Sequence, residues 1–242
     1  MRIARLDSGQ GIVHARHDGD GWIRIEDPYA AFASGHTPAD LGPVTGAVMA
    51  PSEARVVVGI AQNGPGHASP VQAWLKSPRT IVAAGVPVHV RRDAGGTVAD
   101  AEIAIVIGRA TAGLSAANAH EYVLGITAVN DLSSPDRTAL DPRNFESKSG
   151  EGYTPLGPWI DTALDLDDVD LALEVDGRPV ARTDARALPV PIRECLAYLA
   201  LWSPLGAGDV VMTGAPHSQA PVRDGQTVTV VVGGMRLDTP LH

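Results

Sequence analysis

The sequence predicts a mainly β protein with few helices (an α+β class), on three observations. The 26 glycines and 19 prolines among 242 residues imply many turns, which suits a β-rich chain. Short stretches rich in β-branched residues recur along the chain, bounded by turn-forming residues. Only residues 192–203 show the clear apolar periodicity of a helix. We expect a small N-terminal β domain with a linker over residues 1–52, and a main domain over residues 53–242.

Composition argues against several classes of partner. The 19 basic and 28 acidic residues give a net charge of −9, whereas nucleic acid and anionic membranes both attract basic surfaces. The single cysteine excludes an internal disulfide framework and fits a reducing cytoplasm. No stretch approaches about 18 uninterrupted apolar residues, and the first residues lack the apolar core of a signal peptide. We therefore expect a soluble, cytoplasmic protein.

The N-terminal region begins with short strands. They are expected at residues 2–6, 11–17 and 22–26, separated by Asp-Ser-Gly and Asp-Gly-Asp-Gly turn signals. A short helix should follow through residue 33, with Pro28 in its favourable first turn. Residues 35–51 are rich in Gly, Pro and Ala without periodicity, so a linker is expected there.

The main domain should consist largely of strands. They are expected at residues 56–60, 73–76, 86–92, 103–107, 127–131, 171–175, 179–183, 209–213, 226–232 and 235–241. A helix is expected over residues 115–124, with Ser115 as N-cap. In the helix over residues 192–203, Ile192, Cys195, Leu196 and Leu199 form one apolar stripe. Cys195 is therefore expected to be part of the core rather than a nucleophile.

One predicted strand carries two acidic residues. Side chains alternate along a strand, so Asp100, Glu102, Ala104 and Val106 share a face, with the two carboxylates roughly 7 Å apart at Cα. Carboxylates held beside apolar residues repel each other and lose hydration, and a hard divalent cation would relieve both effects. The residues alone leave open the alternative of a strand end that protrudes into water.

Four motifs resemble the fumarylacetoacetate hydrolase family. They are DAEIAIVIG at residues 100–108, YVLGITAVND at 122–131, KSGEGYTPLGP at 148–158 and GDVVMTGAP at 208–216, in the family's order and spacing. The resemblance covers most of residues 55–240. It implies a roll of mixed β-sheets behind a small N-terminal domain, and a homodimer.

The resemblance also implies a metal site. The family binds Mg²⁺ or a similar ion, here Mg²⁺ or Mn²⁺ with Ca²⁺ as a substitute, through an E-x-E pair and an aspartate after Asn. The matching residues are Asp100, Glu102 and Asp131, with Asp in place of the first Glu. A chelated 2-oxo acid could pass electrons from a breaking bond into a metal-held enolate.

Further site residues are implied by the same resemblance. Lys148 would stabilise developing negative charge, and Thr213 with Gly214 would hold a substrate carboxylate. Lys76 follows a loop that resembles the family's lid, and could act near the substrate or lie on the surface. Ala215 replaces a threonine of the family's turn, so one hydrogen-bond donor is missing.

Several residues of this sequence differ from the family's motifs, and these differences bear on which reaction the protein would catalyse. Hydrolytic members carry a His and, three residues later, a Glu on the lid; here His67 is followed by Pro70. Glu151 could partner Lys148 or His67. Pro135 replaces a substrate-contacting Arg, for which Arg137 could compensate. We expect the lid, residues 62–72, to be mobile without ligand.

The sequence thus favours a metal-dependent enzyme acting on a small-molecule 2-oxo (or enol) dicarboxylic acid. Decarboxylation or oxo–enol isomerisation is the first hypothesis, because residues 148–155 and Pro135 resemble the decarboxylase/isomerase branch of homoprotocatechuate degradation. Hydrolysis of an acylpyruvate C–C bond is the second, and a ligand-binding pseudoenzyme or biosynthetic relative is the third. The substrate, the native metal and the oligomer size stay open.

Overall fold

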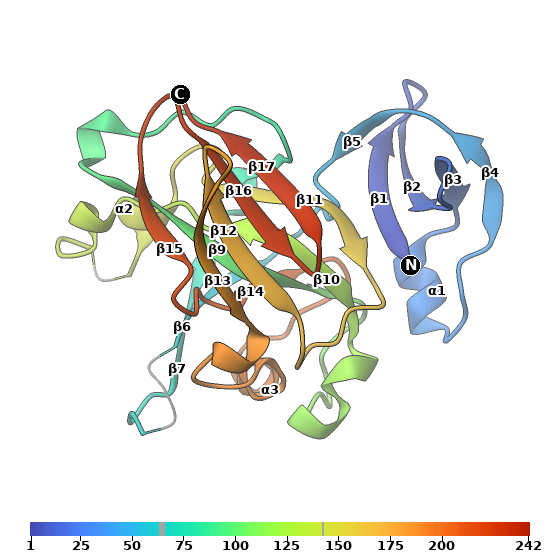
Figure 1. Cartoon of the computed structure of the whole chain (residues 1–242). Coiled ribbons are helices and arrows are strands. Elements are labelled where there is room, and N and C mark those ends of the chain that lie inside the picture. Colours follow the sequence, from blue (N-terminus) through green and yellow to red (C-terminus); the bar gives the residue numbers. More distant parts are fainter. Residues whose placement is uncertain (63–65, 142) are drawn as a thin grey trace.

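The strands form two sheets in the computed structural model of the chain, which describes residues 1–62, 66–141 and 143–242. Within those ranges one sheet has 13 strands, with the path β4-β3-β2-β1-β11-β10-β9-β14-β6-β7 and three further strands beside it. The other has four strands, in the order β13-β12-β16-β17. Figure 1 shows β1–β5 and α1 on one side of the molecule and the four-stranded sheet over the larger body. The mainly β prediction is confirmed.

The N-terminal elements match the predicted order. β1 (Arg2–Asp7), β2 (Ile12–His17) and β3 (Trp22–Ile25) are antiparallel neighbours. Asp27 caps α1 (Pro28–Ala33), because its carboxylate accepts hydrogen bonds from the backbone N–H groups of the first turn.

The predicted linker over residues 35–51 is wrong. β4 (Asp40–Val44) pairs with β3 there, and β5 (Ala47–Met49) pairs with β1. Both strands are largely exposed, so they lack the apolar alternation by which a strand is recognised. Their strand conformation comes from pairing with neighbours.

β1 connects the N-terminal region to the main body. It pairs with β11 (Thr154–Asp161), with Ile3 opposite Ile160 and Arg2 opposite Asp161. β8 (Ile81–Ala83) lies parallel to another part of β11. The main sheet therefore contains strands from both sides of the predicted domain boundary at residue 52, and that boundary stays a prediction.

The acidic strand lies at the centre of the main sheet. β9 (Thr97–Ile107) lies between β10 (Val123–Asn130) and β14 (Val210–Met212), and its first half also pairs with β15 (Gln219–Val222). Its isoleucines enter one core cluster, while Ala104 and Val106 enter another. The predicted alternation of faces is confirmed.

One end of the main sheet is formed by β6 (Val57–Gln62) and β7 (Val71–Lys76). β6 lies parallel to β14 and antiparallel to β7. From β9 outward the order is β14, β6 and β7, and Lys76 at the end of β7 nevertheless reaches Asp131 beside the acidic strand.

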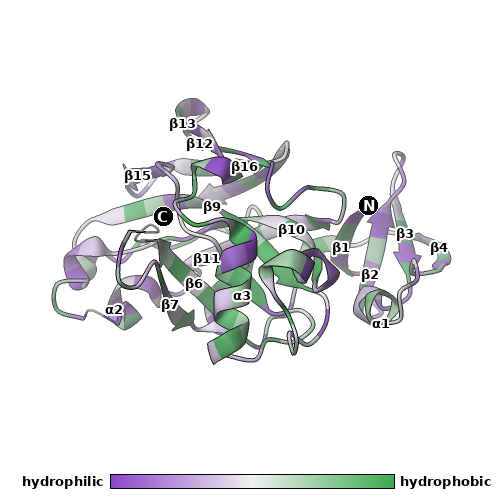
Figure 2. Cartoon of the chain, turned by 90° about the horizontal axis from the view of Figure 1, so that it is seen from below, coloured by the Kyte–Doolittle hydropathy of each residue, from purple (hydrophilic) through white to green (hydrophobic). Residues whose placement is uncertain are grey.

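The smaller sheet and the one long helix complete the core. β12 (Asp170–Val175) and β13 (Arg178–Asp184) form the predicted hairpin, continued by β16 (Thr227–Val232) and β17 (Met235–Pro240). α3 (Ile192–Trp202) buries its predicted stripe, Cys195 included. Figure 2 shows α3 lying across the face of the main body. No helix in the described ranges is long and apolar enough to cross a membrane.

Several shorter elements differ from prediction. The expected strand over residues 86–92 is wrong, since only Val88 makes a β-bridge, to Leu241. The expected helix over residues 115–124 is a 3₁₀ helix, Ala116–Glu121, preceded by Ser115 as predicted. α2 (Phe145–Lys148), β8, β11 and β15 were not predicted. The remaining 3₁₀ turns in the described ranges are Pro78–Thr80, Arg92–Ala94, Pro135–Arg137 and Ala185–Ala187.

Candidate metal and substrate site

Three carboxylates meet where β9 and β10 lie side by side. β9 carries Asp100 and Glu102, and Asp131 directly follows β10. The pairing of Val129 with Glu102, and a hydrogen bond from the Asp131 N–H to the Asp100 carbonyl (2.9 Å), fix their relative positions. One oxygen from each carboxylate lies within 4.8 Å of the others. The residues that the resemblance implied as ligands are thus brought together.

Two lysines bind these carboxylates. Lys76, fully buried at the end of β7, donates to Asp131 Oδ1 and to the Tyr153 carbonyl (2.7 Å). Lys148, at the end of α2, donates to Asp131 Oδ2 (2.6 Å) and Asp100 Oδ2 (3.1 Å). Both oxygens of Asp131 therefore accept a hydrogen bond from a lysine. A surface position for Lys76, one of the two alternatives from the sequence, is wrong.

Burial and charge act differently on the three acids. Burial raises the pKa of Asp100, and raises the pKa of Glu102 well above its ordinary value. Burial acts the same way on Asp131, but Lys148 and Lys76 outweigh it and hold its pKa below the ordinary value. Asp131 is therefore the firmly ionised member, while the ionised forms of Asp100 and Glu102 lack sufficient positive charge nearby.

The two lysines also differ. Burial lowers the pKa of Lys76, against the attraction of Asp131. Burial opposes the charge of Lys148 too, but Asp131, Asp100 and Glu102 outweigh it and raise the Lys148 pKa. Lys148 is thus a persistent cation at the site.

The donor set fits a hard divalent cation. All three groups offer carboxylate oxygens, the ligands that Mg²⁺, Mn²⁺ and Ca²⁺ prefer. Asp100 Oδ1 is buried and has no hydrogen-bond partner in the part of the chain that the structure describes. Coordination would satisfy this oxygen, which is otherwise destabilising. Asp100, Glu102 and Asp131 could therefore hold a metal ion.

A cavity of about 650 Å³ opens onto this cluster. Its lining includes Asp100, Glu102, Lys148 and Gly214. The Gly214 N–H donates to Glu102 Oε2 (2.8 Å), and the Thr213 hydroxyl donates to the Ile103 carbonyl (3.0 Å). Gly214 thus positions the Glu102 carboxylate, and a role of Thr213 and Gly214 in substrate binding stays a prediction.

Three other predicted site residues lie away from the cavity lining. His67 is exposed, and its Nδ1 accepts a hydrogen bond from the Ser69 N–H (3.0 Å). Glu151 is exposed, and Arg137 pairs with Glu146 (Nε to Oε2, 2.7 Å). Residues 63–65 of the expected lid lie outside the described residues, so the predicted mobility is not tested. The roles proposed for these side chains stay predictions.

Among the cavity-lining residues that the sequence did not single out, Trp74 and Gln219 lie close to the charged groups. Trp74 lies two residues before Lys76 on β7, so the two side chains share a face of the strand. Trp74 lines the cavity, and Lys148 Nζ lies 5.6 Å from the centre of the Trp74 ring. Strand periodicity could have found Trp74, because residues 73–76 were expected as a strand. Gln219 lies opposite Asp100 in the β15–β9 pairing, so the two share a face. Nothing in the sequence marked Gln219, since β15 was not recognised as a strand.

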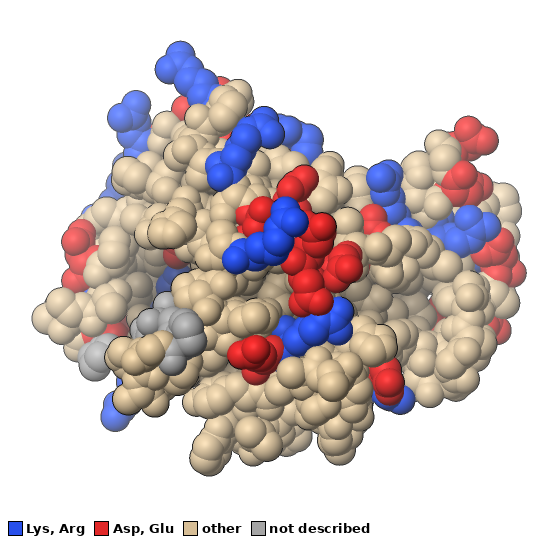
Figure 3. All heavy atoms as spheres, turned by 60° about the horizontal axis from the view of Figure 1, so that its bottom comes forward, with Lys and Arg blue, Asp and Glu red and all other residues tan. Residues whose placement is uncertain are grey.

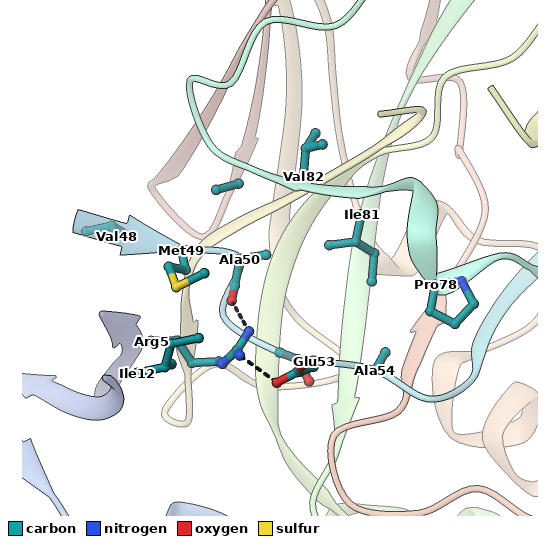
Figure 4. A pocket seen from close by; sticks show the side chains of 12 residues that line it. Arg5, Ile12, Val48, Met49, Ala50, Glu53, Ala54, Pro78, Ile81 and Val82 are labelled. Carbon is teal, nitrogen blue, oxygen red and sulfur yellow. Dashed lines mark hydrogen bonds and ion pairs between the residues drawn. The ribbon is translucent and has the colours of Figure 1, made fainter. Parts of the chain in front are cut away.

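A second cavity, of about 340 Å³, lies where the N-terminal region meets β8. Figure 4 shows the Arg5 guanidinium there, bound to Glu53 (2.8 Å) and to the Ala50 carbonyl (3.1 Å). Because its charged groups satisfy each other, this cavity offers less chemistry than the carboxylate site.

The fold and the cluster of carboxylates and lysines beside a cavity are of the kind found in enzymes that act on small molecules. The family model for the fumarylacetoacetate (FAA) hydrolase C-terminal domain matches residues 49–239, most of the chain. The chain belongs to the fumarylacetoacetate hydrolase family.

Individual relatives agree with this assignment. Protein Rv2993c of Mycobacterium tuberculosis is 29% identical over 97% of this chain and 95% of its own length. The homoprotocatechuate catabolism bifunctional isomerase/decarboxylase of Escherichia coli is 25% identical over 72% of this chain, a match that spans only 40% of that longer protein. The crystal structure of 5-carboxymethyl-2-hydroxymuconate delta-isomerase from Mycobacterium smegmatis superimposes with a TM-score of 0.90, at 32% identity, over 100% of this chain and 99% of its own.

Proposed function

We propose that the protein is a divalent-metal-dependent enzyme that decarboxylates or isomerises a 2-oxo (or enol) dicarboxylic acid. The observation that carries this proposal is the cluster of Asp100, Glu102 and Asp131 beside Lys148 at the end of a cavity. The relatives named as isomerases or decarboxylases support the same reaction class. A divalent cation bound by the three acids would polarise the carbonyl of a chelated 2-oxo acid.

The chain's own residues have distinct tasks in this reaction. Lys148 lines the cavity and would donate to the substrate oxygen on which negative charge develops. Asp131 orients that ammonium group through its Oδ2. Trp74 packs beside Lys148 and keeps water from one side of the site.

Hydrolysis has less support from the geometry. It needs a general base that activates water, and His67, the candidate, lies outside the lining of the cavity. Pro70 carries no carboxylate that could assist an imidazole.

The test is a turnover assay on protein stripped of metal with a chelator. With added Mg²⁺ or Mn²⁺, we expect CO₂ release from 2-oxo diacids, or exchange of their α-protons in D₂O. Glu102→Gln should lower metal affinity, measured by calorimetry, and reduce turnover by about 10²-fold or more. Asp93→Asn is the matched control, because Asp93 pairs with Arg91 at the surface. Full turnover by metal-free protein would contradict the proposal, and faster cleavage of acylpyruvates would favour hydrolysis.

A further inference from the structure

A third cavity, distinct from the one near Arg5, adjoins the carboxylate site. It measures about 390 Å³ and shares Ala61, Gln72, Trp74 and Asn144 with the cavity that opens onto Asp100 and Glu102. The two spaces therefore adjoin at these residues of β6, β7 and the segment before α2. A molecule longer than one cavity could occupy both.

Arg143 lines this adjoining cavity. Its side chain is exposed, and among the described residues its guanidinium forms no hydrogen bond or ion pair, although Asp141 lies close enough to interact electrostatically. Arg137, six positions earlier, differs because Glu146 occupies its guanidinium. Arg143 thus presents an available cation.

The carboxylate cavity itself offers little for a second anion. Among the described residues that line it, Lys148 is the only lysine or arginine, and Asp131 and Asp100 already bind its ammonium group. The other polar side chains that line it, besides Asp100 and Glu102, are an imidazole, a hydroxyl and three amides, namely His217, Thr138, Gln72, Asn144 and Gln219. A dicarboxylic substrate with one end at the acidic cluster would gain from a permanent cation at its other end, and the adjoining cavity supplies the guanidinium of Arg143.

We propose that Arg143 binds the remote carboxylate of the substrate and so selects diacids over monoacids. This inference rests on the proposed function, since it assumes that the 2-oxo acid end lies at Asp100, Glu102 and Asp131. A guanidinium matches a carboxylate with two parallel hydrogen bonds, which gives both affinity and orientation. Gln72 and Asn144, which line both cavities, would lie along the middle of such a substrate.

Binding is tested separately from turnover, with two probes that differ only in the remote group. They are 2-oxoheptanedioate and 2-oxoheptanoate, titrated calorimetrically in saturating Mg²⁺ into the whole chain. We expect the protein to bind the diacid about 10- to 100-fold more tightly than the monoacid, as a charged hydrogen bond would give. Arg143→Gln should remove this preference by weakening diacid binding alone, and Arg143→Lys should restore part of it.

Two further variants sharpen the outcome. Arg178→Gln, an exposed arginine of β13 that lines neither cavity, should keep the preference. Loss of the preference in Arg137→Gln but not in Arg143→Gln would overturn the inference. Equal binding of both acids by the unaltered protein would also overturn it while leaving the proposed function intact. Failure of both acids to bind would overturn the proposed function as well.

Discussion

At the scale of single residues, Asp131 and Lys76 form a buried ion pair on which the stability of the site depends. Both side chains are fully buried, and each binds other groups as well, Lys148 in one case and the Tyr153 carbonyl in the other. Removal of one member of such a pair leaves an uncompensated charge in the interior, which is strongly destabilising. The three carboxylates are therefore unequal, although the same metal would bind all three.

Asp131→Asn should destabilise the protein by about 3–5 kcal/mol, because Lys76 would be left buried without a counter-ion. Urea unfolding in a chelator measures this change without any contribution from metal. Glu102→Gln, under the same conditions, should be close to neutral, because burial already opposes its ionisation. The double variant Lys76→Met with Asp131→Leu should recover much of the loss. Equal stability of Asp131→Asn and the unaltered protein would contradict this account.

The sequence predicted the acidic residues better than their partners. Strand alternation placed Asp100 and Glu102 on one face, and the family motif added Asp131. The contact between Lys76 and Asp131 spans 55 positions, and no local pattern encodes it. Arg137 was chosen by its proximity in sequence to a missing Arg, whereas Glu146, nine residues later, determines where its guanidinium lies.

At the scale of elements, β6 and β7 hold one wall of the site through very close packing. Gly59 on β6 lies opposite Trp74 on β7, and a Cβ atom at position 59 would collide with the indole ring. Trp74 in turn packs beside Lys148. The absence of a side chain at Gly59 thus determines where the wall of the cavity lies.

Gly59→Ala should therefore displace Trp74 and destabilise the protein by about 1–3 kcal/mol, as overpacking usually does. A change in tryptophan fluorescence and a lower unfolding midpoint would report it, together with reduced turnover. Gly21→Ala is the control, since no atom lies within 4 Å of a Cβ there. An unchanged emission spectrum in Gly59→Ala would refute the close approach.

Elements were predicted well where burial imposes a pattern and poorly where pairing alone creates the strand. β9, the hairpin of β12 and β13, and α3 all carry the apolar periodicity of their buried faces. β4 contains Gly42 and Pro43, and β15 contains Pro221, residues that normally disfavour strands. Both form because a neighbouring strand supplies hydrogen-bond partners.

At the scale of the whole molecule, the N-terminal strands extend the sheet that carries the site. β1 pairs with β11, and β11 pairs with β10, which leads directly to Asp131. Figure 3 shows one face of the molecule, where acidic and basic side chains are intermixed and uncharged surface predominates. The continuity of the sheet predicts that both regions unfold together.

Ile3→Ala should destabilise the entire chain by about 2–5 kcal/mol, because Ile3 is buried in β1 opposite Ile160. We expect circular dichroism and tryptophan fluorescence to give one coincident transition, shifted to lower denaturant. Ile12→Ala, in the neighbouring strand but 51% exposed, should change stability by less than about 0.5 kcal/mol. Two separate transitions would instead support an independent domain over residues 1–52.

The lysines around Asp131 also bear on whether folding of the chain would depend on a metal ion. If all five groups are ionised, two ammonium groups stand against three carboxylates, so the finished pocket retains a single uncompensated negative charge. The chain therefore supplies most, although not all, of the counter-charge of the pocket from its own lysines. A metal ion held by Asp100, Glu102 and Asp131 would then bind to a chain that is already folded, and folding would not require it.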